Sequence, residues 1–204
     1  MEQHKPLHLG LAVTGSYCSF GKLERVLPAL CRQFQVIPIL SENAQRDSRF
    51  GTGLHWRGVW EELCGNRAVT SIAEAEPLGP SNAIDVLAVA PCTGNTLGKL
   101  AAGITDTAVT MAVKGHLRNG KPLVIGVSTN DGLGASAQSI GRLLARRNVY
   151  FVPFGQDDPE AKPSSLSLCY PCLADAVLAA ARGLQLQPLL LGAEDMHRNF
   201  PLQG

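Results

Sequence analysis

Short apolar runs alternate with segments of helical periodicity along this chain, and that alternation restricts its fold more than any other feature. Each run is too short for a typical helix and is rich in Val, Leu and Ile, as are strands buried on both faces. Strands and helices in alternation imply βαβ units and a parallel sheet whose two faces are covered by helices. The predicted strands span 7–13, 36–40, 69–72, 85–90, 122–127 and 149–152, and the predicted helices span 22–33, 52–63, 97–102, 106–117, 135–147 and 173–182.

The chain has the features of one domain. Its 204 residues contain no internal repeat, low-complexity tract or linker, so we expect a single domain over 1–204. Pro38 lies within a predicted strand, which places it near an edge of the sheet or at the start of a strand. The segment 155–167 is rich in Pro, Asp and Ser and is predicted to be a long loop of the kind that is often functional. The tail after Pro188 is predicted to be irregular and ordered by a partner.

Charge and hydrophobicity exclude two classes of protein. The 18 Lys and Arg residues nearly balance the 17 Asp and Glu residues, so the chain lacks the basic surface of a nucleic-acid-binding protein. No apolar run approaches the roughly 20 residues that a membrane span needs. The first residues carry no hydrophobic stretch of a secretory signal, which makes the cytoplasm the expected compartment. Because only 17% of the residues are charged, we expect part of the surface to be covered by a partner or by copies of the chain.

Six cysteines are present, and two of them form the motif Cys169-Tyr-Pro-Cys172. This spacing is that of half a zinc site or of a redox pair. No second CxxC or HxxxH completes a tetrahedral ligand set, so no metal site is predicted. In a reducing cytoplasm such cysteines are more often small buried hydrophobic residues. We favour that structural interpretation and leave the role of the pair open.

Small polar residues follow four of the predicted strands. In an open parallel sheet, ligands bind outside the carboxyl ends of the strands, where the strand order reverses. Backbone N–H groups at helix N-termini favour anions there. Together these segments predict a phosphate site made of neutral donors. The segments are Thr14-Gly15-Ser16, Ser41, Pro91-Cys92-Thr93-Gly94-Asn95-Thr96 and Ser128-Thr129-Asn130.

Two common phosphate motifs are absent. The chain has no GxxxxGK[ST] loop, and it has no GxGxxG after its first strand, so an ordinary dinucleotide-binding fold is not supported. For any single strand end, a Ser or Thr that caps a helix is the simpler interpretation. Four such strand ends in succession favour a ligand.

Residues 90–106, with the sequence APCTGNTLGKLAAGITD, resemble the "APASANTIAKLANGIADD" segment of the FMN-binding flavoprotein superfamily. That superfamily includes phosphopantothenoylcysteine decarboxylases, peptidyl-cysteine decarboxylases and flavin prenyltransferases. The resemblance covers about residues 7–155 and implies a three-layer Rossmann-like (flavodoxin-like) sheet. It divides the domain into this core and a C-terminal helix and tail over 156–204. It further implies that FMN is held at a subunit interface, in trimers or multiples of trimers.

The resemblance also implies site residues. By position, a Gly-Ser turn, a Ser after the second strand and two Thr residues would hold the FMN phosphate, and an Asn would fix the flavin or the adjacent loop. No Arg or Lys stands beside these positions, which fits a neutral cradle. The segment that replaces the "PxMN" motif would bind substrate. The implied cofactor-binding residues are Gly15, Ser16, Ser41, Thr93, Asn95 and Thr96, and the implied substrate-binding residues are Thr129 and Asn130.

Two departures from the decarboxylases put cysteine decarboxylation in doubt. The decarboxylases carry a catalytic His before the "APASANT" strand, where residues 72–80 here contain none. The "PxMN" motif is replaced by Val127-Ser128-Thr129-Asn130-Asp131, which keeps only the Asn. Asp131, Glu74 and Glu76 are candidate bases, each equally explained by a capping or surface role. The catalytic residues are therefore left unassigned.

Nearly the whole chain resembles the B subunits of dipicolinate synthase, on GSYCSF (15–20), the segment 75–134 and NVYFVPFGQDDPEAKPSS (148–165). The resemblance implies a flavoprotein that acts with an A subunit in the mother cell of sporulating bacteria. The implied reaction converts dihydrodipicolinate to dipicolinate (pyridine-2,6-dicarboxylate) by flavin-dependent dehydrogenation. FMN is the implied cofactor, and whether NADP also binds in the complex is left open. Besides Thr129 and Asn130, the candidates for binding the dicarboxylate are Arg142, Arg146, Arg147 and a partner's side chain.

Two other functions fit the residues. One is a binding or stabilising subunit that has the flavin fold without catalysing the reaction. The other is a phosphopantothenoylcysteine-type decarboxylase with displaced catalytic residues. In all three cases, the expected partners are small molecules and other protein subunits.

Overall fold

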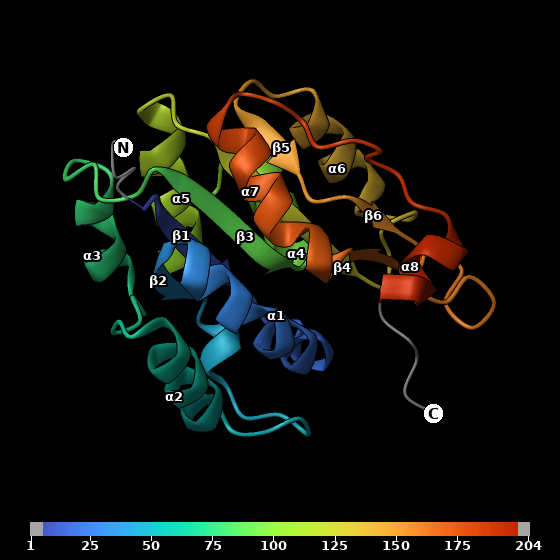
Figure 1. The fold of residues 1–204 in the computed structure, drawn as a ribbon, viewed down its shortest axis with the longest axis horizontal. Coiled ribbons are helices and arrows are strands. Elements are labelled where there is room, and N and C mark those ends of the chain that lie inside the picture. The colour runs from blue at the N-terminus through green and yellow to red at the C-terminus, as the bar shows by residue number, and fades with distance from the viewer. Residues whose placement is uncertain (1–5, 200–204) are drawn as a thin grey trace.

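A central sheet with helices on both faces forms the fold in the computed structural model, which describes residues 6–199 (Figure 1). The strands are β1 (His8–Val13), β2 (Gln35–Leu40), β3 (Val86–Cys92), β4 (Leu123–Thr129), β5 (Val149–Phe151), β6 (Phe154–Gly155) and β7 (Leu166–Leu168). The α-helices are α1 (Phe20–Gln33), α2 (Gly53–Cys64), α3 (Ile72–Ala75), α4 (Gly94–Ala102), α5 (Ala108–Arg118), α6 (Ala137–Leu144), α7 (Leu173–Ala181) and α8 (Ala193–Asn199). Four 3-10 turns are η1 (Tyr17–Ser19), η2 (Asn43–Gln45), η3 (Glu76–Leu78) and η4 (Tyr170–Cys172).

Five strands form the parallel part of the sheet, in the order β2-β1-β3-β4-β5. This is the strand order of flavodoxin-like folds, and it reverses at β1 and β3. Two short strands, β7 and β6, continue the sheet antiparallel beside the carboxyl end of β4. The α/β class is thus confirmed, but the sheet is mixed where a parallel one was predicted. The extra strands form at the two ends of the segment 155–167 that was predicted to be one long loop, and residues 156–165 between them contain no strand or helix.

Two hydrophobic cores lie on opposite faces of the sheet. Helices α1, α2 and α7 cover the face that is turned toward the viewer in Figure 1, where Phe20 packs edge-on against Trp56 and Trp60. Helices α3, α4, α5 and α6 cover the other face. Every residue of β3 is buried, as its continuous apolar sequence predicts for a central strand. The rigid sheet fixes where the loops at its carboxyl edge begin.

Side-chain caps explain where four helices begin. Thr52, Ser71, Thr93 and Thr107 each accept a hydrogen bond from the backbone N–H three residues later, at the starts of α2, α3, α4 and α5. Such a cap satisfies an N–H group that has no partner within the helix and stabilises it by about 1 kcal/mol. The Thr93 cap shows that the simpler interpretation of a strand-end hydroxyl applies to at least one predicted site residue.

The strand predicted at 69–72 is wrong apart from one residue. Val69 forms a single parallel bridge with Ile39, and its N–H donates to the carbonyl of Pro38 at 2.9 Å. Helix α3 begins soon after this bridge, because Ser71 and Glu74 form a reciprocal capping box that ends the extended backbone. The placement of Pro38 on an edge strand is confirmed, since β2 is the outermost strand of the sheet.

The end of the chain is more regular than predicted. The main chain on both sides of Leu190 pairs with β6: the Phe154 N–H donates to the Leu189 carbonyl, and the Leu191 N–H donates to the Phe154 carbonyl. Helix α8 follows directly, so residues 189–199 of the predicted tail are not irregular but are joined to β6 of their own domain. The predicted helix at 135–147 is also shorter, ending at Leu144.

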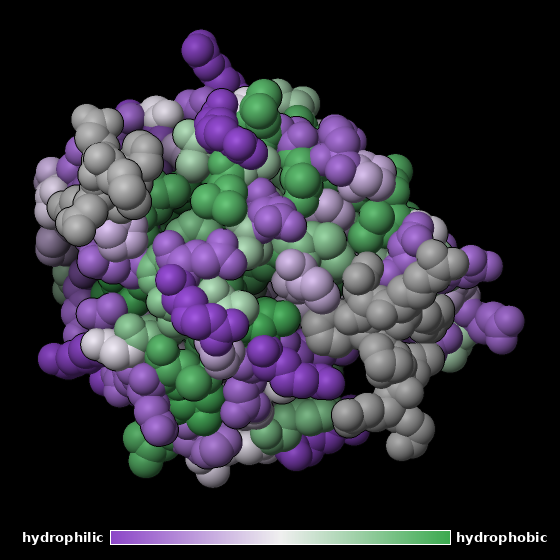
Figure 2. Space-filling model, in the orientation of Figure 1, coloured by the Kyte–Doolittle hydropathy of each residue, from purple (hydrophilic) through white to green (hydrophobic). Residues whose placement is uncertain are grey.

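The N-terminal residues on which the secretory prediction depends, and the last five residues of the predicted tail, lie outside the described residues. Within the described part, no helix is both long enough and apolar enough to cross a membrane. Figure 2 shows that hydrophobic residues reach the surface in several small groups between hydrophilic ones. This mixed surface agrees with the low share of charged residues in the sequence.

Candidate functional site

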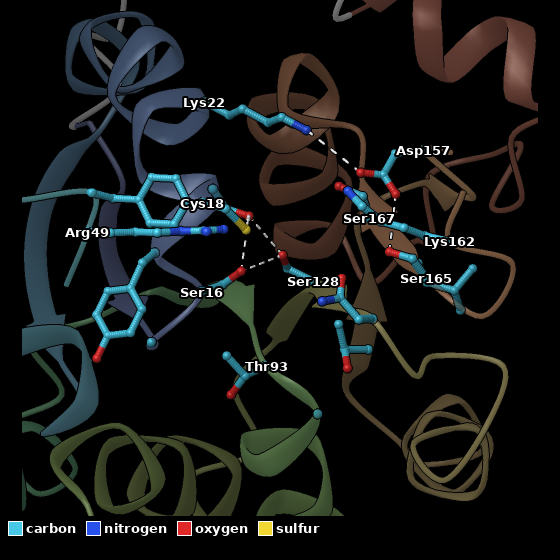
Figure 3. A pocket seen from close by; sticks show the side chains of 18 residues that line it. Ser16, Cys18, Lys22, Arg49, Thr93, Ser128, Asp157, Lys162, Ser165 and Ser167 are labelled. Carbon is cyan, nitrogen blue, oxygen red and sulfur yellow. Dashed lines mark hydrogen bonds and ion pairs between the residues drawn. The ribbon is translucent and has the colours of Figure 1, made fainter. Parts of the chain in front are cut away.

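A pocket of about 540 Å³ opens at the carboxyl ends of β1, β3 and β4, where the strand order reverses (Figure 3). This is the position at which open parallel sheets bind ligands. Its walls come from the strand ends and from two segments far from them in the sequence, one after η2 and one between β6 and β7. The lining residues are Gly15, Ser16, Tyr17, Cys18, Ser19, Lys22, Arg49, Phe50, Thr93, Gly94, Ser128, Thr129, Asn130, Asp157, Lys162, Ser165, Leu166 and Ser167.

Three serine hydroxyls form a triangle in the pocket wall. The Oγ atoms of Ser16 and Ser128 lie 2.8 Å apart, and each lies 3.0 Å from the Oγ of Ser19. Each hydroxyl has one proton to donate and can accept from the others. Ser19 and Ser128 are buried, while Ser16 is partly exposed. The triangle therefore presents polar oxygen atoms, with adjustable protons, to whatever occupies the pocket.

Tyr170 lies behind this triangle. Burial raises the pKa of its hydroxyl, and the nearby hydroxyls of Ser19 and Ser128 oppose that effect. Its turn, η4, follows β7, which contributes Leu166 and Ser167 to the pocket. The C-terminal part of the chain thus supports a wall that is built mainly from its N-terminal half.

The turn between β3 and α4 is tied to the end of β1. The Thr14 hydroxyl donates to the Pro91 carbonyl at 2.7 Å and accepts from the Thr93 N–H at 3.0 Å. A Cβ at Gly94 would lie 2.5 Å from the Ser136 Oγ and 2.8 Å from the Thr129 Oγ1. Glycine is therefore needed at this position, because α4 begins in contact with the loop after β4.

Cations also line the pocket, which corrects the expectation of a neutral cradle. Lys22 extends from α1, and its Nζ lies 4.0 Å from an oxygen of Asp157, which also accepts a hydrogen bond from Ser165 (Figure 3). Arg49 and Lys162 are exposed residues that line the same space. None of the three cations is close in sequence to the strand ends, so the sequence pattern did not reveal them.

The structure brings five of the eight predicted site residues into the pocket and leaves three outside it. Ser41 is buried and accepts a hydrogen bond from the Ala44 N–H, and Thr96 is buried with its Oγ1 3.1 Å from that of Thr93. Asn95 is exposed. Cofactor binding by these three residues stays a prediction. The five in the pocket are Gly15, Ser16, Thr93, Thr129 and Asn130.

Two of the candidate bases have structural partners. Hydrogen bonds from the Ser136 and Thr129 hydroxyls lower the pKa of Asp131. Hydrogen bonds from the backbone and hydroxyl of Thr70 lower the pKa of Glu74, which also closes the capping box of α3. These hydrogen bonds favour the charged carboxylate form of both side chains. They also fix the backbone around each residue, which is a structural role. Neither they nor Glu76 line the pocket.

Two serines of the pocket differ in what the sequence displays. Ser128 belongs to the predicted strand-end segment Ser128-Thr129-Asn130, and its position after the apolar run of β4 was the signal. Ser19 had no such signal, because it lies within a helical turn and reaches the pocket only through the direction of η1. Arg142 and Arg147, which were candidates for dicarboxylate binding, do not line the pocket, and Arg146 lines a different hollow.

Comparisons with known proteins agree with this architecture. The family model described as Flavoprotein matches residues 1–137. The B subunit of dipicolinate synthase from Bacillus subtilis (strain 168) is 39% identical over 193 residues, which cover 94% of this chain and 96% of that protein. The crystal structure of the dipicolinate synthase B subunit from Bacillus halodurans C superposes with a TM-score of 0.83 at 39% identity, covering 91% of this chain and 96% of that one. The FMN-dependent cysteine decarboxylase SpaF shares the fold, with a TM-score of 0.63 at 22% identity, over 86% of this chain and 97% of that one.

Proposed function

This chain belongs to the flavoprotein family, and from that premise we propose that it is the FMN-binding B subunit of a dipicolinate synthase. In the proposed complex it acts with an A subunit on dihydrodipicolinate and yields dipicolinate. The observation that carries the proposal is the 39% identity with the Bacillus subtilis protein across nearly the full length of both chains. By the same likeness we propose the mother-cell cytoplasm of a sporulating bacterium as its compartment and a homo-oligomer as its assembly.

The pocket fits FMN by chemistry. A phosphate needs hydrogen-bond donors and positive charge. The hydroxyls of Ser16, Ser19 and Ser128 supply donors, and Lys22 supplies charge. A Cβ at Gly15 would lie 2.9 Å from the Cβ of Asn43, so backbone there approaches η2 too closely for a larger residue.

The same pocket also suits a dianionic substrate. Arg49 and Lys162 can pair with carboxylates, and Thr129 and Asn130 add polar groups at the end of β4. When bound, FMN supplies a two-electron acceptor, which the oxidation of a dihydro ring requires. The role of this chain is then to orient the ring and to receive a proton.

Asp157 is the one carboxylate among the residues that line the pocket. Lys22 and Ser165 hold it on the wall formed between β6 and β7. We therefore assign Asp157 as the residue that receives the proton. The expected result for Asp157→Asn is a purified protein that retains FMN but oxidises substrate at least about 100-fold more slowly, the lower range for general base catalysis.

The decisive experiment has two steps. First, the purified protein should show the absorbance bands of FMN. Second, these bands should bleach under anaerobic conditions when dihydrodipicolinate is added in the presence of the A subunit, and the same mixture should be tested without it and with NADP. Bound FMN that stays oxidised in every mixture would make the chain a binding or stabilising subunit instead.

A variant pair tests the substrate side. Asn130→Ala should raise the substrate concentration needed for half-maximal bleaching, because it removes an amide from the pocket. Gln138→Ala is the control, since Gln138 is exposed on α6 and does not line the pocket. If both variants raise this substrate concentration equally, the assignment of the substrate site to the pocket is wrong. Light scattering tests the proposed homo-oligomer, which a stable monomer would contradict.

A further inference from the structure

Two cysteines that the pocket does not use, Cys169 and Cys172, flank a single turn between β7 and α7. The N–H of Cys172 donates to the carbonyl of Cys169 at 3.0 Å and closes η4. Residues joined in this way have Cα atoms within about 7 Å of each other. Disulfides span Cα separations of about 4.4–6.8 Å, so the backbone already holds the two residues near the distance that a disulfide requires.

Both residues are free thiols, and the thiols interact. The Cys172 thiol donates a hydrogen bond to the sulfur of Cys169, which lowers the pKa of Cys169 to about 7 even though burial opposes the effect. The same hydrogen bond raises the pKa of Cys172. Cys169 therefore loses its proton at a lower pH than Cys172 does. A dithiol in this state is more reactive than an isolated thiol, because the thiolate is the nucleophile.

The two sulfurs differ in access. Cys169 is 1% exposed, whereas Cys172 is partly exposed at the start of α7. An external reagent can thus reach Cys172, and Cys169 is positioned behind it. This is the arrangement of an attacking and a resolving thiol. Among the described residues, no group of three His, Cys, Asp or Glu side chains could hold a metal.

We propose that Cys169 and Cys172 form a redox-active dithiol that small-molecule disulfides such as oxidised glutathione convert to an intramolecular disulfide. The Cys169 thiolate takes the proton of Cys172 while the sulfur of Cys172 attacks the reagent disulfide, forms a mixed disulfide and releases one thiolate. Cys169 then loses its proton to solvent, attacks the Cys172 sulfur and releases the second thiolate. The protein loses two electrons and two protons, and the reagent disulfide is reduced to two thiols. The site lies beside the pocket, since Tyr170 stands between the two cysteines and its hydroxyl faces Ser19 and Ser128.

A second pair of interacting thiols must be separated from the first in the experiment. Cys31 of α1 and Cys64 of α2 also share a hydrogen bond, which lowers the pKa of Cys31 and raises that of Cys64. These two residues lie on different helices, with no turn that holds their backbones together. The full-length triple variant Cys18→Ser, Cys31→Ser, Cys64→Ser isolates the Cys169–Cys172 pair, because the remaining Cys92 is buried.

The test treats the wild-type protein and the triple variant with a glutathione redox buffer and then traps free thiols with iodoacetamide. Mass spectrometry of the peptide that carries both cysteines should show the loss of two hydrogen atoms in each protein. The oxidation rate should rise with pH through about 7, below the 8.5 or so of an ordinary thiol.

Single variants identify the roles of the two sulfurs. Cys169→Ser should accumulate the glutathione adduct on Cys172, because the resolving thiol is missing. Cys172→Ser should accumulate at least about tenfold less adduct, because Cys169 is buried. Thermal unfolding shows that each variant is folded. If both thiols of the wild-type protein are still fully alkylated after exposure to oxidised glutathione, the proposal is wrong, and it is equally wrong if Cys169→Ser forms no adduct.

Discussion

Two hollows in this molecule differ in how they are built. The pocket at the carboxyl edge of the sheet, about 540 Å³ in volume, is lined by serine and threonine hydroxyls together with Lys22, Arg49 and Lys162. The second hollow, about 320 Å³ in volume, lies at α4 and α5 and is lined by four aliphatic and three basic residues together with two threonines and a glycine. We call it the α5 groove; its residues are Leu100, Gly103, Ile104, Thr105, Thr110, Val113, Lys114, Leu117, Arg118 and Arg146.

The difference shows what the sheet contributes. Strand ends deliver several short polar segments to one place, so the pocket gathers donors from residues that are more than a hundred positions apart, such as Ser16 and Ser128. The α5 groove draws on one continuous stretch of the chain plus Arg146. Its lining comes from α4, α5 and the loop between them, and its charged groups are the side chains of its rim. Only the first hollow lies at the strand ends where open parallel sheets bind ligands, and only there do serine hydroxyls from distant segments meet.

The largest expected effect comes from a negative charge in the pocket. Ser16→Asp should reduce FMN affinity by on the order of 1,000-fold, because like charges placed together cost several kcal/mol. Titration followed by flavin fluorescence measures this loss. Thr105→Asp introduces the same charge in the α5 groove and should leave the affinity unchanged. Retained FMN in the Ser16 variant would place the phosphate elsewhere.

Acid should destabilise the folded protein through a buried histidine of α5, the helix that lines the α5 groove. His116 of α5 is buried, and burial lowers its pKa to about 4, against a value near 6.5 when unfolded. The unfolded chain therefore binds the proton first as the pH falls. The neutral imidazole makes its full contribution to the free energy of unfolding above about pH 6.5. That contribution decreases as the pH falls toward 4, by at most about 3 kcal/mol.

Urea unfolding at several pH values measures this dependence. The variant His116→Gln keeps a side-chain donor near the Pro122 carbonyl and cannot titrate. Between pH 6.5 and pH 4, the free energy of unfolding should decrease less for this variant than for the wild-type protein. Equal losses in the two proteins would show that His116 is not responsible.

Lys22→Gln should have a moderate effect on the pocket. Removing this charge should weaken FMN binding about tenfold, which corresponds to one charge-assisted hydrogen bond, and should reduce the sensitivity of binding to salt. Lys114→Gln removes a charge from the rim of the α5 groove and is the matched control. If both substitutions weaken binding equally, general electrostatic attraction explains the effect and the pocket geometry does not.

The smallest expected effect separates a capping serine from a pocket serine. Ser41→Ala should lower the free energy of unfolding by about 1 kcal/mol, because its Oγ accepts a hydrogen bond from the Ala44 N–H, and should leave FMN affinity within about twofold of wild type. Ser16→Ala should show the reverse pattern. Calorimetry and FMN titration of the two variants give the comparison. A large loss of FMN affinity in the Ser41 variant would restore the role that the family resemblance implies for it.

Much of the fold could be predicted because its signals are local. The buried strands β1, β3 and β4 appear as continuous apolar runs, and α2, α4 and α5 begin at caps that the sequence displays. The errors occur where tertiary contacts override the local pattern. The antiparallel pair β6 and β7 is too short to give a periodic signal, and it forms because the edge of β4 is available to it.

For this protein, the sequence by itself determined the α/β class, the flavoprotein family and the polar segments at the strand ends, since each depends on residues that are close together in the chain. Only the tertiary structure decided which hydroxyls line the pocket and which lie outside it and bond to nearby backbone, as the difference between Ser16 and Ser41 shows. It also brought Lys22, Arg49 and Lys162 to one site. The physical reason is that the charge and shape of a binding site depend on where side chains from distant segments point. Packing of those segments against the sheet fixes these directions.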